Sequence, residues 1–258
     1  MALLNTEGLS INFGGLWAVK DVDFAVESRE IVGLIGPNGS GKTTFLNIIS
    51  GIYKATKGNV YLQGEELGHL KPYQIYAKGI SRTYQSSRLC WDISVADNVL
   101  MGLYSHQDSS LAETIFRPQK SNRKMSKHVE EAMEMLSYFN PELPEKIYEL
   151  PKNIPHIDRR RIEISRALIG SPKLLLLDEP TAGLNDEETM SMMRDIRKIK
   201  DKLQEIAIII IEHDMKVMRE VPERIVVFNA GEKISEGSYE DITNDPLVIS
   251  AYLGRSKK

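Results

Sequence analysis

The stretch EIVGLIGPNGSGKTTFLNIISGIY, residues 30–53, decides the fold. Its opening, EIVGLIG, is a short apolar run that ends in glycine, as is typical of a buried strand. The segment that begins TTFLNIIS continues as a helix, with Gly51 as its stop. Between them, GPNGSGKTT (residues 36–44) matches G-x-x-x-x-G-K-[ST] in the strand–loop–helix context that this motif requires. We therefore predict a phosphate-binding loop (P-loop) rather than a glycine-rich structural turn.

The residue types of this loop indicate its chemistry. The glycines let the backbone curl so that its amides point at phosphate oxygens, and the following helix adds the positive end of its dipole. Lys42 can reach the β- and γ-phosphates, and the Thr43 hydroxyl can ligate Mg²⁺. The predicted nucleotide-binding residues of the loop are Gly36, Pro37, Asn38, Gly39, Ser40, Gly41, Lys42, Thr43 and Thr44.

Two further apolar runs deliver polar side chains to strand ends. LLLLDEP, residues 174–180, places Asp178 where it can hold the hydration shell of the metal. Glu179, the next residue, can polarise or deprotonate an attacking water. IAIIIIEH ends in His213, and because neighbouring parallel strands end at one edge of a sheet, we expect His213 to contact the γ-phosphate. Gln85, at the end of SRTYQ, could reach the metal and the attacking water. The alternatives are solvated acids and a structural histidine.

An aromatic pair precedes the P-loop. Phe13 and Trp17 lie in NFGGLWAV, where an aromatic face could stack on adenine or belong to the core. We favour Phe13 as the stacking residue, because the adjacent glycines would let a base approach.

Composition limits the classes of function. The chain has 258 residues and a formal net charge of −3, which gives no electrostatic case for nucleic-acid binding. Its single cysteine, Cys90, excludes an intrachain disulfide and fits a reducing compartment. We expect no signal peptide, and the longest apolar runs, residues 174–177 and 206–211, are too short to span a bilayer. If the protein serves a membrane process, another polypeptide crosses the membrane.

The chain is predicted to be an α/β core that is interrupted by a helical insertion. The first 35 residues have strand character, and the character changes to helical at about residue 86. Helical patterns there flank a polar excursion over residues 105–124, which we predict to be a loop. The charge runs 159–161 and 257–258 are predicted to be solvated faces or helix decoration.

These motifs, in this order, resemble the ATPase subunit of ABC transporters over nearly the whole chain. The resemblance covers an aromatic A-loop at Phe13, Walker A at 36–44, a Q-loop at Gln85, Walker B at 174–179 and a switch histidine at His213. It implies one domain over 1–258, with a P-loop NTPase core over 1–85 and 169–258, an N-terminal antiparallel β subdomain, and a helical subdomain over 86–168. It implies ATP hydrolysis with Mg²⁺, with Glu179, His213 and Gln85 as catalytic residues and Thr43, Gln85 and Asp178 at the metal.

A finer resemblance points to the LivG branch, the ATPases of branched-chain amino-acid importers, with relatives that serve urea and short-chain amides. It rests on the segments FGGLWAVKDV, TAGLN, IIEHDMKVM and DPLVISAYLG. It implies two integral-membrane permease subunits, a second, LivF-like ATPase subunit and, indirectly, a substrate-binding protein. The chain would be peripheral at the cytoplasmic face of the membrane, with residues 85–91 receiving the permease.

The signature motif of the family is missing. In the family two ATPase subunits sandwich two ATP molecules, and an LSGGQ-type signature, just before a basic helix, contacts the ATP on the partner's P-loop. Here RRRIEISRAL is that helix, which puts Ile154, Pro155, His156, Ile157 and Asp158 in the signature slot. Pro155 brings no donor, Ile157 adds bulk, and Asp158 would bring negative charge towards a polyanion. We therefore expect a degenerate signature on an intact fold.

Two interpretations follow from the degenerate signature. In the first, the chain pairs with a different ATPase, and its own P-loop site, completed by that partner, hydrolyses ATP. In the second, it is a homodimer with two weakened sites, a nucleotide-gated binding module of low turnover. We favour the first, because the chain retains Lys42, Asp178, Glu179 and His213 together.

Overall fold

The central element is a mostly parallel sheet that carries the P-loop. The structure is a computed structural model that describes residues 2–106 and 118–253. The sheet has the order β10-β9-β3-β8-β7-β6, and all neighbours are parallel except the β9–β10 hairpin. Its strands are β3 (Ile31–Ile35), β6 (Ile80–Arg82), β7 (Leu174–Asp178), β8 (Ala207–Ile211), β9 (Arg224–Asn229) and β10 (Glu232–Gly237).

A second, antiparallel sheet is built from the N-terminal part of the chain. Its order is β2-β1-β4-β5. The strands are β1 (Leu4–Phe13), β2 (Leu16–Val26), β4 (Lys57–Leu62) and β5 (Glu65–Glu66). The two sheets face each other across the P-loop helix α1 (Lys42–Ile49), whose Phe45 contacts Phe24 of β2 and Phe228 of β9. One core therefore fills the space on this side of the parallel sheet.

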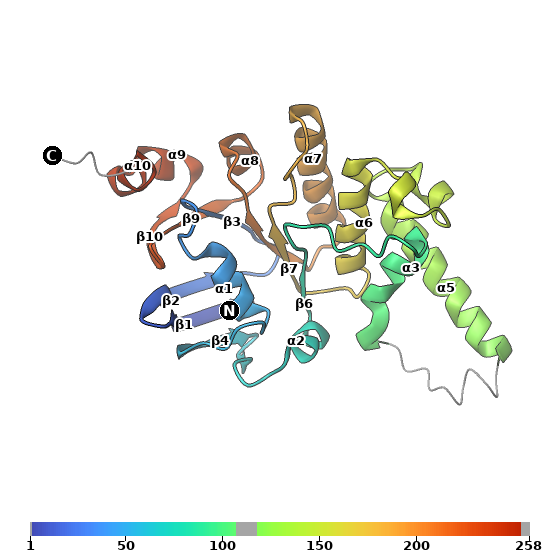
Figure 1. Ribbon diagram of the computed structural model, residues 1–258, viewed down its shortest axis with the longest axis horizontal. Coiled ribbons are helices and arrows are strands. Elements are labelled where there is room, and N and C mark those ends of the chain that lie inside the picture. Colours follow the sequence, from blue (N-terminus) through green and yellow to red (C-terminus); the bar gives the residue numbers. More distant parts are fainter. Residues whose placement is uncertain (1, 107–117, 254–258) are drawn as a thin grey trace.

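Helices cover the other face of the parallel sheet (Figure 1). β3, β7 and β8 are buried along their whole length, which explains their continuous apolar sequences. The remaining helices outside the insertion are α2 (Pro72–Lys78), α7 (Asp186–Lys202), α8 (Met215–Glu220), α9 (Tyr239–Asn244) and α10 (Pro246–Leu253). Asn185 caps α7 and accepts the N–H of Glu188, as expected at a helix start.

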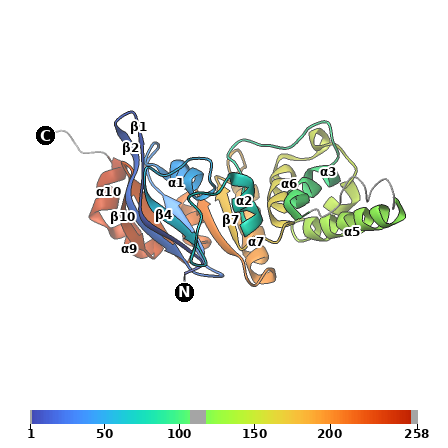
Figure 2. The ribbon, with the colours of Figure 1, turned by 90° about the horizontal axis from the view of Figure 1, so that it is seen from below.

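The helical insertion forms a separate lobe, which Figure 2 shows at the end of the molecule away from the two sheets. It has its own apolar core. Its elements are α3 (Val95–Leu100), the 3₁₀ helices η1 (Met101–His106), η2 (Leu143–Lys146) and η3 (Pro151–Asn153), and the helices α5 (Pro118–Ser137) and α6 (His156–Leu168). The expected fold class, an α/β core with an antiparallel β subdomain and an inserted helical subdomain, is confirmed.

Three local expectations differ from the structure. The loop predicted over 105–124 lies mostly outside the described residues, and its last part is the first turns of α5. Helix α6 begins at His156, four residues before the helical rhythm expected from Arg160. The run 159–161 is not a solvated face, because Arg160 and Arg161 are buried and both make ion pairs.

The C-terminal hairpin supports the P-loop from outside. The N–H of Gly231, in the β9–β10 turn, donates to the carbonyl of Ser40 over 3.0 Å, and the carbonyl of Gly231 accepts the N–H of Lys20 over 2.8 Å. The loop is thus held between the N-terminal sheet and the last strands of the core. Among the described residues, no helix is long and apolar enough to cross a membrane.

Candidate nucleotide site

The P-loop turns sharply between β3 and α1, and two of its glycines allow this. Gly36 has φ +149° and Gly41 has φ +105°, a region that other residues rarely adopt. A Cβ on Gly36 would lie 2.1 Å from the carbonyl oxygen of Phe228, and one on Gly41 would lie 2.3 Å from that of Ala18. These positions therefore need glycine because neighbouring backbone approaches them closely.

The Lys42 ammonium lies inside the loop that it was predicted to serve. Nζ donates to the carbonyls of Gly36 and Pro37 over 2.7 and 3.1 Å and to Oγ of Ser40 over 3.3 Å. The residue is only 5% exposed, and this burial lowers the pKa of Lys42. A phosphate that enters the loop would exchange these contacts for its own oxygens.

Glu179 stands opposite the P-loop and joins two other predicted catalytic residues. Nε2 of His213 lies 2.6 Å from Oε1 of Glu179, and Nε2 of Gln85 donates to its Oε2 over 2.7 Å. The expectation that the ends of β7 and β8 meet at one sheet edge is borne out by the register, which pairs Asp178 with Ile211. Glu179 itself has φ +51°, so the turn after β7 aims its carboxylate with a strained backbone.

One cavity of about 360 Å³ contains these groups together. Because the P-loop glycines, Lys42 and the carboxylate of Glu179 face the same space, the arrangement can hold an anion and place a base against it. The cavity is lined by Ala18, Asn38, Gly39, Ser40, Gly41, Lys42, Thr43, Thr44, Gln85, Glu179 and His213. Gly36 and Pro37 shape the loop from behind and do not line the cavity.

Asp178 lies behind this cavity, not on its wall. Its carboxylate is buried and accepts Nη2 of Arg82 over 2.8 Å, and Nη1 of Arg82 donates to Oδ1 of Asn47 on α1 over 2.7 Å. Arg82 thus joins the ends of β6 and β7 to the P-loop helix. No sequence pattern indicates this role of Arg82, because the role depends on which strand pairs with β7.

The predicted metal ligands fit Mg²⁺ by donor type, since Thr43 and Gln85 offer a hydroxyl and an amide oxygen on the cavity wall. Asp178 would act from behind through the hydration shell, because Arg82 occupies Oδ2 of its carboxylate. The described residues contain no cluster of three or more His, Cys, Asp or Glu side chains that could hold a metal ion.

The structure keeps Phe13 at the surface but outside the phosphate cavity. Its ring is 48% exposed and packs edge-on against Tyr53, with the ring centroids 5.4 Å apart. Trp17 lies under Lys57, whose Nζ is 5.7 Å from the ring centroid. Tyr53, which the sequence reasoning missed, offers a second exposed ring beside Phe13. Adenine stacking on Phe13 stays a prediction.

The signature slot is formed differently from the expectation. Pro155 precedes the first turn of α6, where its missing N–H costs nothing. Ile154 is buried in the core of the helical lobe. The idea that Asp158 brings negative charge towards a phosphate is wrong, because its buried carboxylate accepts Nη1 of Arg161 over 2.8 Å. Arg161 in turn bonds Asp195 of α7 over 2.7 Å, so Asp158 serves the packing of α6 on α7.

His156 and Ile157 remain partly exposed at the start of α6. A Cβ on Gly183, in the turn between β7 and α7, would lie 3.2 Å from Cε1 of His156. The imidazole therefore packs on the backbone of that turn. Within the slot, Pro155, His156 and Ile157 are the residues that could reach a facing nucleotide, and neither a serine hydroxyl nor a glycine is among them.

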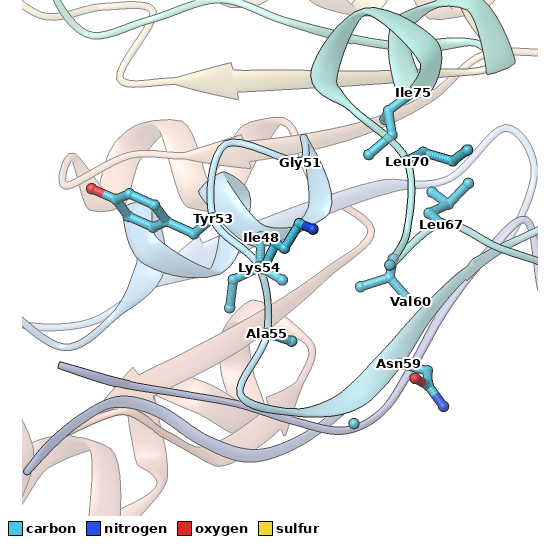
Figure 3. Close-up of a pocket in the computed structure, with 12 residues that line it drawn as sticks. Ile48, Gly51, Tyr53, Lys54, Ala55, Asn59, Val60, Leu67, Leu70 and Ile75 are labelled. Atoms are coloured by element: carbon cyan, nitrogen blue, oxygen red, sulfur yellow. The ribbon is translucent and has the colours of Figure 1, made fainter.

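A smaller cavity lies at the far end of α1 (Figure 3). It measures about 20 Å³, room for about one water molecule. Ile48, Leu67, Leu70 and Ile75 converge on it and join α1 to α2. It is a packing seam that anchors the P-loop helix, and it adds nothing to the nucleotide site.

Comparison with known proteins agrees with this geometry. The family model "ABC transporter" matches residues 19–182. The chain belongs to this family. It is accordingly an ABC-type ATPase, and a second family model, "branched-chain amino acid ATP-binding cassette transporter", matches residues 232–258.

The similar proteins span the chain almost completely. The branched-chain amino acid transport ATP-binding protein BraF of Pseudomonas aeruginosa is 36% identical, and LivG of Escherichia coli is 37% identical, each alignment covering 98% of both chains. The crystal structure of a nucleotide-free ATP-binding cassette from an ABC transporter superposes with a TM-score of 0.84 at 28% identity, covering 99% of this chain and 100% of that one. The ADP conformation of an ATP-binding cassette gives the same TM-score.

Proposed function

We propose that this ATPase powers the import of branched-chain amino acids through separate permease subunits, as a peripheral subunit at the cytoplasmic face of the membrane. The similarity to BraF and LivG, which are branched-chain amino acid transport ATP-binding proteins, supports the solute class. The hydrolytic role is supported by the position of Glu179, whose carboxylate contacts Gln85 and His213 across the cavity from the P-loop.

The proposed mechanism divides binding, proton transfer and metal ligation among the groups of the cavity. The P-loop amides and Lys42 bind the phosphates of ATP. Glu179 accepts the proton of the attacking water, while Gln85 orients that water and His213 contacts the γ-phosphate. Mg²⁺, held by Thr43 and Gln85 with Asp178 behind them, would shield the phosphate charge when bound.

We further propose that a different, LivF-like ATPase completes this P-loop site. The signature slot supports an asymmetric pair, because Pro155 offers no donor and Ile157 adds bulk where glycine backbone would approach phosphate. The partner's signature would complete the site that contains Lys42 and Glu179 of this chain. The opposite site, facing Pro155 and His156, would bind ATP and turn over poorly. A substrate-binding protein and two permeases complete the proposed assembly.

The test compares P-loop lysines in the assembled transporter. Lys42→Ala in this chain should abolish ATP turnover, whereas the same change in the P-loop of the second ATPase should cost little, because that P-loop faces the degenerate slot. The isolated chain should turn over slowly, and Pro155→Ser/His156→Gly/Ile157→Gly should raise its rate. Strong turnover by the unmodified isolated chain would contradict the asymmetric pair, because it would show that the degenerate slot supports hydrolysis.

The solute class needs its own measurement. ATP-driven uptake of labelled leucine into vesicles that contain the complete transporter should stop with Lys42→Ala. Uptake of urea or a short-chain amide, without leucine, would assign the protein to those relatives instead.

A further inference from the structure

A buried ion pair on α6 faces the segment that carries Gln85. Nη1 of Arg160 lies 3.1 Å from Oε2 of Glu163, one helical turn further on, and the two side chains are only 9% and 5% exposed. Charged pairs at this depth cost desolvation energy, so their presence is weak evidence that they stabilise the fold. The pair has further partners that indicate another use.

The pair holds the Gln85 segment at both ends. Nη2 of Arg160 donates to the carbonyl oxygen of Gln85 over 2.8 Å. Oε1 of Glu163 accepts the backbone N–H of Arg88 over 2.8 Å. We call this arrangement, Arg160 and Glu163 on the backbone of residues 85–88, the α6 clamp.

The clamp is linked to Glu179, the proposed general base, through a single residue, Gln85. The side chain of Gln85, whose carbonyl the clamp holds, donates to Glu179 over 2.7 Å. Nη2 of Arg160 also lies 3.5 Å from the carbonyl of Ala182, and the N–H of Ala182 donates to the carbonyl of Glu179 over 3.1 Å. Two short routes therefore lead from Arg160 to Glu179.

We infer that Arg160 is a positioning residue for hydrolysis: through the α6 clamp it sets the place of Gln85 against Glu179. The inference rests on the proposed function, since it takes Gln85 and Glu179 as the hydrolytic pair. Helix α6 begins at His156, directly after Pro155, and both residues belong to the slot proposed to face the other nucleotide. A shift of α6 at one site would therefore move Gln85 at the other, which couples the two sites within one chain.

The chemistry of the clamp favours arginine. A planar guanidinium can donate to Glu163, Gln85 and Ala182 from one fixed position, whereas an ammonium is a point charge on a flexible stem. Arg161 provides the contrast, because it is equally buried but bonds Asp158 and Asp195, away from Gln85.

The first experiment is a double-mutant cycle on ATP turnover by the complete transporter, with the variants Arg160→Gln, Gln85→Ala and both together. A substitution far from the reacting atoms that misplaces a catalytic group can cost about 10²-fold. We therefore expect Arg160→Gln to lower kcat about 10- to 10²-fold, with KM for ATP nearly unchanged. The double variant should be no slower than Gln85→Ala alone, and Arg160→Lys should recover part of the rate. Arg159→Gln, whose guanidinium instead lies over Trp91, is the matched control and should keep the wild-type rate.

The second experiment needs no partner subunit. Amide hydrogen exchange in the full chain should be roughly 10-fold faster or more over residues 85–88 in Arg160→Gln, and unchanged in Arg159→Gln. If Arg160→Gln does not fold, Arg160→Met/Glu163→Met removes both charges of the pair and takes its place.

The outcomes distinguish the α6 clamp from the catalytic role of Gln85. Additive effects in the cycle, or unchanged exchange over residues 85–88, would overturn the clamp while leaving the role of Gln85 intact. Wild-type turnover by Gln85→Ala would overturn the proposed role of Gln85 and the inference with it.

Discussion

Replacing Glu179 by glutamine is expected to slow ATP hydrolysis sharply while ATP binding persists. The variant keeps the size of the side chain and one oxygen, so it can still contact either Gln85 or His213. It loses the negative charge and the proton acceptor. Removing a general base typically costs on the order of 10²- to 10⁴-fold in rate, which is about 2.7–5.4 kcal/mol at about 1.36 kcal/mol for each factor of ten.

Binding should respond in the opposite direction. The P-loop groups that hold the phosphates come from the β3–α1 turn, and Glu179 lies across the cavity from them. Because Glu179→Gln removes a negative charge that faces a polyanion, the Kd for ATP should stay equal or fall. The variant should therefore accumulate in the ATP-bound state.

The assay pairs steady-state ATP turnover of the complete transporter with equilibrium ATP binding to the chain. Glu187→Gln, an exposed acid in the first turn of α7, is the control for loss of one negative charge and should keep the wild-type turnover. Turnover by Glu179→Gln within about 10-fold of wild type would refute the assignment of the base. Weaker ATP binding by Glu179→Gln would refute the conclusion that Glu179 serves hydrolysis while the P-loop serves ATP binding.

Three other substitutions test the frame of the site. Gly41→Ala should destabilise the fold by more than Gly39→Ala in thermal unfolding, since both have positive φ but only the Cβ at Gly41 would meet backbone, at 2.3 Å; equal effects would contradict this. Arg82→Met should cost about 3–5 kcal/mol in denaturant unfolding because it leaves Asp178 buried and uncompensated; a cost under about 1 kcal/mol, as for exposed pairs, would refute it. Burial raises the pKa of Glu212 above its ordinary 4.5, so the folded protein holds a proton that the unfolded chain releases. That stabilisation is present below pH 4.5 and is lost as pH rises through the folded pKa, so wild type should lose stability relative to Glu212→Gln over that window. A difference that is constant with pH would contradict the raised pKa.

Features that depend on a single strand or loop could be predicted from the sequence. The P-loop pattern predicted the β3–α1 turn, and the apolar runs of β7 and β8 predicted adjacent parallel strands that end beside each other. That adjacency predicted that His213 and Asp178 would emerge at the same sheet edge, whereas the contact of His213 with Glu179 was not predicted. These features are local, or they depend only on the pairing of two neighbouring strands.

Side-chain partners distant in sequence could not be predicted in the same way. The Arg82–Asp178 pair requires β6 to lie beside β7, and nothing in SRTYQ indicates it. Asp158 was expected to face a nucleotide because the motif was aligned by position, whereas the start of α6 at His156 turns its carboxylate inward to Arg161. The expectation that residues 159–161 form a solvated face was wrong for the same reason, because α6 buries Arg160 and Arg161.

The support of the P-loop by Gly231 affects the order in which the protein can fold during synthesis. The loop sequence is complete once Thr44 has been synthesised. The carbonyl of Ser40, however, can accept its hydrogen bond only after Gly231, almost two hundred residues later, has been made. The strand before it, β3, pairs only with β8 and β9, which are also late. The ribosome must therefore release most of the chain before the nucleotide site has its native walls, and contacts so distant in sequence form slowly. Until then ATP has no folded site to stabilise, and β3 is an unpaired apolar strand of the kind that is prone to aggregate during folding.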